Sequence, residues 1–99
     1  MSHLAHQFDL NRLRAFVTVA EERSITAASR RLGVAQPALS ASIRRLETDL
    51  GVSLFDRLPR GMALTAAGRA LLPQVYDVFG ILGAIRVNLS GMADRKSVV

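Results

Sequence analysis

Two short amphipathic segments joined across a glycine occupy residues 25–50, and they constrain the fold more than any other feature. In the second segment, at about 100° per residue, the apolar side chains fall within roughly 40° of one another. The opposite face carries small, polar and basic residues and is free to contact a partner. Pro37 suits the first turn of a helix, because the amide that it lacks would have no partner there. We therefore expect a helix from about Gln36, with these residues on its packed face: Leu39, Ile43, Leu46 and Leu50.

The first segment, from about Thr26 to Leu32, carries small alanines, Ala27 and Ala28, that let another helix approach closely. Gly33 follows at the place where a helix ends in a left-handed residue. Helix, glycine turn and helix at this spacing are typical of a helix-turn-helix, whose second helix enters the major groove of DNA with its N-terminal residues at the base edges. The same pattern also fits an αα-hairpin of an all-helical domain, so both interpretations stay open at this point.

The composition favours a polyanionic partner. The 99 residues suffice for one domain. The chain has a net charge of +5 and a pI near 11.3, which does not by itself distinguish DNA from RNA or an acidic membrane. Lys96 is the only lysine among the thirteen basic residues. Guanidinium groups bind phosphate and guanine edges with paired donors, so the arginine bias fits nucleic acid, and it equally fits a host with GC-rich codons.

Several other classes of protein are disfavoured. The chain has no cysteine, and its two histidines, His3 and His6, lie in a polar leader. We therefore expect no metal site, no cofactor and no disulfide. No Ser/His/Asp set and no glycine loop that could hold a phosphate is present, so an enzyme is not expected. No apolar run reaches the ~18 residues of a membrane span, and the start lacks the features of a signal peptide. We expect a cytoplasmic protein with no membrane partner.

The flanking segments complete a small helical body. Asp9 is a good N-cap for a helix over residues 9–23, which carries one apolar face. The adjacent Glu21 and Glu22 point to different sides of that helix, and we interpret them as a solvated charge run. The apolar residues of this first helix, which we expect to brace the helix-turn-helix, are Leu10, Leu13, Phe16, Val17 and Ala20.

After Gly51 the pattern changes to two short apolar runs separated by Pro59-Arg60-Gly61. This is turn chemistry, so we expect a small two-stranded wing. Such a hairpin is marginal alone and must be held onto the helices, here by Leu54, Phe55 and Leu64. At the tip, Arg60 either enters the minor groove of DNA or is simply solvated.

A last helix, capped by Thr65, should run to about Met92 and carry apolar residues in alternating steps of four and three. Such a heptad seam indicates pairing with another helix. Pro73 should bend or loosen the helix locally. We expect it to pair with its own copy, although the seam could also be ordinary core or cover sequence outside this chain. The expected dimer interface is Leu71, Val75, Val78, Phe79, Leu82, Ile85 and Leu89.

From about Phe8 to Leu72 the chain resembles the N-terminal DNA-binding domain of LysR-type transcriptional regulators. The resemblance implies a mainly α winged helix-turn-helix with a small two-stranded wing and a long linker helix that dimerises antiparallel. The residues that carry it are Leu13, Phe16, Val19, Glu21, Ser24, Ala27, Ala28, Leu32, Gln36-Pro37-Ala38-Leu39-Ser40, Ile43, Leu46-Glu47, Leu50-Gly51, Leu54-Phe55, Arg57, Leu64-Thr65 and Ala67-Gly68.

The resemblance also divides the chain into a leader (1–8), the winged body (9–64), the linker helix (65–93) and a tail (94–99). It implies a bacterial regulator that binds an inverted-repeat operator in double-stranded DNA as a homodimer and is nucleoid-associated when bound. The family's C-terminal effector domain lies outside this chain. We therefore expect no small-molecule effector on this fragment, and a tetramer stays open for a full-length protein.

The resemblance also implies which residues contact DNA, by their matching positions in the family. We expect base reading by Gln36, Pro37, Ser40 and Ala41, phosphate contacts by Ser24, Thr26, Arg44, Arg45 and Arg57, and a minor-groove contact by Arg60. Arg57 has a structural alternative as an ion-pair partner of Glu47. Ala41 and Ser42 are shorter than the basic or amide side chains frequent in the family, so fewer bases should be read directly. Ala35 removes a cap from the reading helix.

The competing interpretation is a dimeric helical interaction module whose helix-turn-helix binds protein. Retention on DNA that depends on salt would favour the regulator, and indifference to DNA would favour the module.

Overall fold

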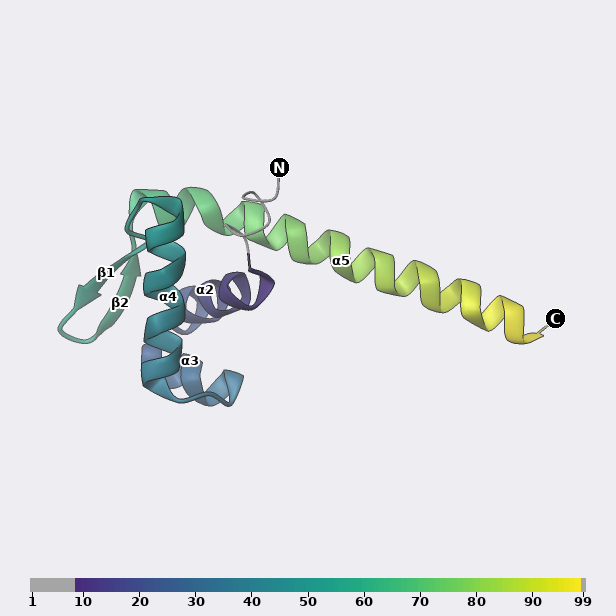
Figure 1. Ribbon diagram of the computed structural model, residues 1–99, viewed down its shortest axis with the longest axis horizontal. Helices are drawn as coiled ribbons and strands as arrows, with labels where there is room; N and C mark the ends of the chain where they lie inside the picture. Colours follow the sequence, from purple (N-terminus) through teal and green to yellow (C-terminus); the bar gives the residue numbers. More distant parts are fainter. Residues whose placement is uncertain (1–8, 99) are drawn as a thin grey trace.

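The computed structural model describes the backbone of residues 9–98 and the side chains of residues 9–92. The chain measures 59 × 34 × 22 Å, because the last helix projects from a small body (Figure 1). The mainly helical fold with a two-stranded wing and a long C-terminal helix is confirmed. In order, the elements are α2 (Leu10–Glu22), α3 (Ile25–Leu32), α4 (Gln36–Leu50), β1 (Phe55–Leu58), β2 (Gly61–Leu64) and α5 (Ala66–Val98).

The helix ends follow the local chemistry of the sequence. Asp9 Oδ1 accepts a hydrogen bond from the Asn11 amide at 2.8 Å, so the expected cap of α2 is confirmed. Gly33 ends α3 in the left-handed region with φ +69°. α4 begins at Gln36 with no side-chain cap, which agrees with the alanine at position 35.

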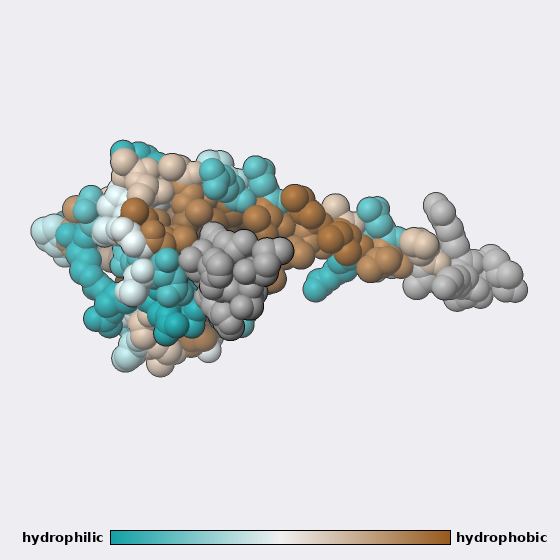
Figure 2. Space-filling view, turned by 45° about the horizontal axis from the view of Figure 1, so that its top comes forward, coloured by the Kyte–Doolittle hydropathy of each residue, from teal (hydrophilic) through white to brown (hydrophobic). Residues whose placement is uncertain are grey.

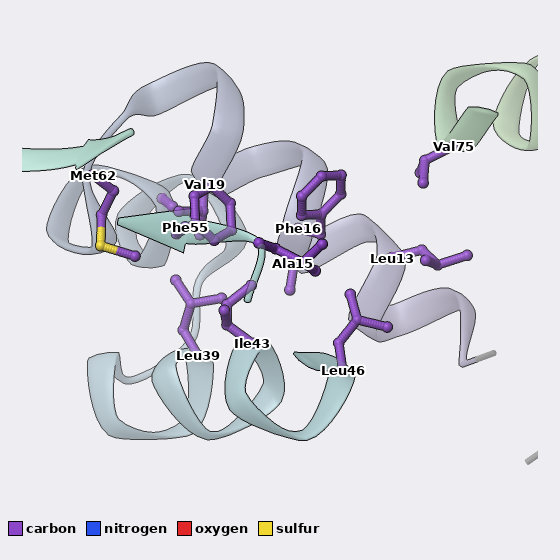
Figure 3. Close-up of a cluster of buried hydrophobic side chains, with 12 residues drawn as sticks. Leu13, Ala15, Phe16, Val19, Leu39, Ile43, Leu46, Phe55, Met62 and Val75 are labelled. Atoms are coloured by element: carbon purple, nitrogen blue, oxygen red, sulfur yellow. The ribbon is translucent and has the colours of Figure 1, made fainter. Parts of the chain in front are cut away.

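The core lies where α2 crosses α4 and meets the wing. Figure 3 shows three side chains of α4 pointing toward α2, among them Leu39 and Ile43. Phe16 of α2 is fully buried, and its ring centroid lies 5.5 Å from that of Phe55. Of the apolar residues expected on packed faces, Leu10 is exposed, because it lies in the first turn of α2, and Val17, Ala20 and Leu50 are only partly buried. The buried apolar residues are Leu13, Ala15, Phe16, Val19, Ala28, Leu39, Ile43, Leu46, Leu54, Phe55, Met62 and Val75.

The wing is an antiparallel hairpin in which Phe55 pairs with Leu64 and Leu58 with Gly61, leaving Pro59 and Arg60 as the turn. Leu54 and Phe55 are buried and Leu64 partly so, as expected of the residues that hold it. Met62 is a further buried anchor that we did not anticipate.

α5 begins in close contact with the wing. Thr65 Oγ1 accepts from the Gly68 amide at 3.1 Å, which confirms Thr65 as the cap, and donates to Ser53 O at 2.6 Å. A Cβ at Gly68 would lie only 2.3 Å from Leu54 O and 2.8 Å from Leu64 Cδ2. Glycine therefore permits an approach that no other residue allows without a shift of the backbone.

The course of α5 differs from the expectation in two respects. The helix passes through Pro73 and continues to Val98, beyond the expected end near Met92. Val75 is only 2% exposed, so it packs within the chain rather than in an intermolecular seam, whereas Leu71, like Phe79, is partly buried against the core and stays a predicted seam residue. The sequence pattern cannot distinguish the two uses, because both bury the same stripe of the helix.

Beyond Val75 the apolar side chains of α5 lie mostly on the surface, and Figure 2 shows brown, hydrophobic surface running along the projecting helix. Against our expectation, Ala66–Met92 is long and apolar enough to cross a membrane, with a mean hydropathy of 1.3 over 18 residues. A single such helix is weak evidence for a span. Its first turns pack on the body, through Gly68 and Val75.

Candidate nucleic-acid interface

An open groove of about 900 Å³ lies between α4 and the wing. α4 supplies most of its lining and β1 supplies Arg57; Figure 1 shows the two elements side by side. The fold thus brings together residues that sequence reasoning assigned to base reading and to phosphate contact. The lining residues are Gln36, Pro37, Ser40, Arg44, Glu47 and Arg57.

The outer face of α4 is available because its inner face is committed to the core. Leu39, Ile43 and Leu46 are buried, whereas Gln36, Pro37 and Ala41 are exposed and Ser40 is half-buried. No side chain caps the start of α4. The first amides of the helix therefore add positive potential at the end of the groove where Gln36 lies.

The two arginines of this groove are free of ion pairs among the described residues, although Glu47 also lines it. Arg12, Arg31 and Arg45 each pair with a carboxylate elsewhere on the body. In contrast, none of the ion pairs formed within residues 9–92 involves Arg44 or Arg57. The groove can therefore attract phosphate without first breaking a salt bridge.

Glu47 has a structural role that the sequence did not reveal. Its Oε2 accepts from the Leu54 amide at 2.7 Å, the Phe55 amide at 3.3 Å and the Ser53 hydroxyl at 3.4 Å. The alternative pairing of Glu47 with Arg57 does not occur among the ion pairs of the described residues. One carboxylate thus attaches the start of the wing to α4 beside the groove.

Arg45 does not line the groove with Arg44. Its Nε lies 3.1 Å from Asp49 Oδ1, one turn along α4, and Asp49 Oδ2 lies 3.6 Å from Arg12 of α2. The expectation for Arg45 arose from its neighbour, yet adjacent helix positions point about 100° apart. A phosphate contact by Arg45 stays a prediction.

The two remaining phosphate candidates lie at the start of α3. Ser24 caps that helix, with its Oγ accepting from the Ala27 amide at 3.1 Å, and it keeps a hydroxyl proton to donate. Thr26 is exposed, and its carbonyl accepts from the Ser29 hydroxyl. Arg60 is exposed at the wing turn.

A polar network joins three helices away from the groove. The Arg31 guanidinium of α3 lies 2.7 Å from Glu21 and 3.2 Å from Glu22, and the Tyr76 hydroxyl of α5 donates to Glu21. The hydrogen bond from Tyr76 and, after it, the one from Arg31 hold the pKa of Glu21 below its ordinary value. The same bond to Glu21 raises the pKa of Tyr76. Both glutamates are exposed, as expected of a solvated charge run, but the sequence did not predict that they pair with Arg31 or that Glu21 binds Tyr76.

A reading helix with a free outer face, a wing beside it and an arginine-lined groove between them define a winged helix-turn-helix DNA-binding domain. The model of the lysR family of bacterial regulatory helix-turn-helix proteins matches residues 10–69, and the chain belongs to this family. Similar proteins are transcriptional regulators. ClcR of Pseudomonas putida is 52% identical over 90 residues, covering 91% of this chain and 30% of that protein.

An uncharacterized regulator of Azotobacter vinelandii, from the ibpB–leuC intergenic region, is 48% identical over 84 residues, which cover 85% of this chain and 58% of that protein. The chain therefore spans little more than half the length of this relative.

Two solved DNA complexes resemble the whole body. The DNA complex of the CbnR DNA-binding domain has a TM-score of 0.81 at 36% identity, covering 87% of this chain and 99% of that one. The BenM DNA-binding domain on catB site 1 DNA has a TM-score of 0.83 at 32% identity, and the match covers 87% of this chain and 97% of that chain.

Proposed function

We propose that this chain is the DNA-binding part of a bacterial LysR-type transcriptional regulator and binds an inverted-repeat operator as a homodimer. The observation that carries the proposal is the groove between α4 and the wing, which presents Gln36 and Ser40 beside two arginines that pair with no carboxylate of residues 9–92. The similarity to two DNA-binding domains solved on DNA supports it.

The roles follow from the chemistry of each side chain. Gln36 can make a bidentate contact with N6 and N7 of adenine in the major groove, and Ser40 can donate or accept one hydrogen bond. Pro37 and Ala41 offer apolar contact to a thymine methyl. Arg44 and Arg57 suit phosphates, which position the domain without specifying sequence.

A second copy of the chain would cover the exposed stripe of α5. Val78, Leu82, Ile85 and Leu89 are 37%, 39%, 49% and 59% exposed. Phe79 lies beside them, partly buried, with the Arg14 guanidinium 5.2 Å from its ring centroid. Antiparallel pairing of two such helices would present two reading helices to DNA with two-fold symmetry, and such a protein would act in the bacterial cytoplasm, on the nucleoid.

The first test is the salt dependence of DNA binding, measured by fluorescence anisotropy on a duplex selected from a random pool. If a dimer neutralises about 6 to 10 phosphates, log K should fall with log salt at a slope near −5 to −9. Footprints should show half-sites about one helical turn apart. A flat salt response would contradict DNA binding.

The second test separates base reading from phosphate contact. Gln36→Ala and Ser40→Ala should each cost about 1–3 kcal/mol on the selected duplex and leave binding to random DNA nearly unchanged. Arg44→Ala is the matched control and should weaken both complexes by the same factor. If Gln36→Ala weakens both equally, Gln36 does not read bases.

A further inference from the structure

The turn between α2 and α3 holds a residue in an unfavourable backbone conformation. Arg23 has φ 56° and ψ 27°, and among the described residues it is the only non-glycine with a positive φ. A side chain with a β-carbon makes this conformation costly, and glycine would adopt it freely. Arg23 is the C-cap of α2, where its amide bonds to the Val19 carbonyl, and a side chain at a place where glycine would serve is a reason to ask what that side chain contacts.

The backbone of Arg23 is attached to the wing. Its carbonyl accepts from the Met62 amide at 3.1 Å, and a Cβ on Gly61 would lie 2.5 Å from the same oxygen. Arg60 directly precedes Gly61 at the wing turn. The turn and the wing tip therefore form one rigid unit that carries two arginines.

A second groove, of about 590 Å³, opens between this unit and α5. We call its three arginines, Arg23, Arg60 and Arg69, the outer arginine patch. The remaining lining is apolar, and the described residues of the lining include no carboxylate. Neither Arg23 nor Arg60 takes part in an ion pair formed within residues 9–92, whereas Arg69 donates to the Leu64 carbonyl at 3.0 Å.

We infer that the outer arginine patch binds the phosphate backbone of DNA next to the half-site that α4 reads, with Arg23 as its central contact. The wing joins the two grooves, since it contributes Arg57 to the inner one and Arg60 to the outer one. The two grooves therefore share the wing, and a duplex bound in the inner groove that extends across the wing would meet arginines that pair with no carboxylate of residues 9–92. The inference rests on the proposed function and adds a contact outside the reading groove.

The test is Arg23→Gly in the full 99-residue chain. The variant should unfold at a higher temperature than the wild type, because relief of the left-handed strain outweighs the greater chain entropy that glycine gives to the unfolded state. It should also bind selected and random duplexes more weakly by the same factor, with the salt slope reduced by about 2 per dimer, about one phosphate per protomer. A gain in stability together with a loss of affinity is an outcome that a purely structural residue would not produce.

Two controls make the result specific. Arg23→Lys keeps the charge and should retain most of the salt slope, and Arg86→Gln removes an exposed charge from α5, outside both grooves, and should not alter the slope. An unchanged slope for Arg23→Gly would overturn the inference and favour an acidic protein as the partner of the patch. A drop in melting temperature for Arg23→Gly would also overturn the inference, because it would show that the Arg23 side chain stabilises the fold. Absence of salt-dependent binding in the wild type would instead refute the proposed function.

Discussion

A methyl group added at Gly68 tests how closely α5 must approach the wing. In Gly68→Ala the new Cβ would lie 2.3 Å from the Leu54 carbonyl oxygen and 2.8 Å from Leu64 Cδ2. The leucine methyl can move, but the carbonyl is fixed because it accepts the Thr65 amide at 3.0 Å. The Leu54 amide is in turn held by Glu47. The first turn of α5 must therefore move away from the wing.

The magnitude follows from opposing contributions. Alanine is favoured over glycine within a helix by about 1 kcal/mol. Overpacking against backbone costs about 2 kcal/mol, and displacement of the turn removes the Thr65 cap and one backbone hydrogen bond, at about 1 kcal/mol each. We therefore expect a net destabilisation of about 3 kcal/mol, which for a domain of this size lowers the melting temperature by roughly 12–24 °C.

Thermal denaturation followed by circular dichroism measures the effect, and Gly80→Ala is the matched control on the same helix. Apart from the neighbouring turns of its own helix, no heavy atom of the described residues lies within 4 Å of a Cβ at Gly80, so that variant should gain up to about 1 kcal/mol from helix propensity. A melting temperature of Gly68→Ala equal to or above the wild-type value would refute the reasoning. Equal losses in both variants would show that the wing contact is not the cause.

Three further outcomes are expected. Glu47→Ala leaves two loop amides without their acceptor, so it should cost about 2–3 kcal/mol in thermal denaturation and weaken DNA binding, whereas unchanged binding would contradict its role in placing the wing. Tyr76→Phe should lower the melting temperature at neutral pH, because it removes a hydrogen bond that stabilises the charged form of Glu21. The difference in stability from the wild type should persist above pH 4.5, the ordinary pKa of Glu21, and disappear as the pH falls through the lowered pKa of Glu21 in the folded protein. A difference that does not depend on pH would contradict this reasoning. Leu82→Asp should give a folded monomer by light scattering that binds only a single half-site weakly, because the seam cannot bury two carboxylates; a persistent dimer would move the interface elsewhere.

The sequence by itself determined the features that depend on neighbouring residues. Gly33, Pro37 and the Pro59–Arg60 turn mark where helices and strands end, because each restricts or frees its own backbone dihedrals. The 3.6-residue period of α4 separates a packed face from a free one, so the exposure of Gln36 was predictable without coordinates. The fold class followed from the same local signals.

Only the tertiary structure decided which distant groups meet. The heptad stripe of α5 contains both Val75, which packs in the core, and Leu82, which is exposed, because the crossing of α5 over the body sets where burial stops. Glu21 of α2 is joined to Tyr76 of α5, 55 residues further along the chain, and Glu47 meets the start of the wing only because the chain turns back after α4. The Arg23 carbonyl likewise accepts from Met62 of the wing, and no periodicity along the chain encodes such a contact.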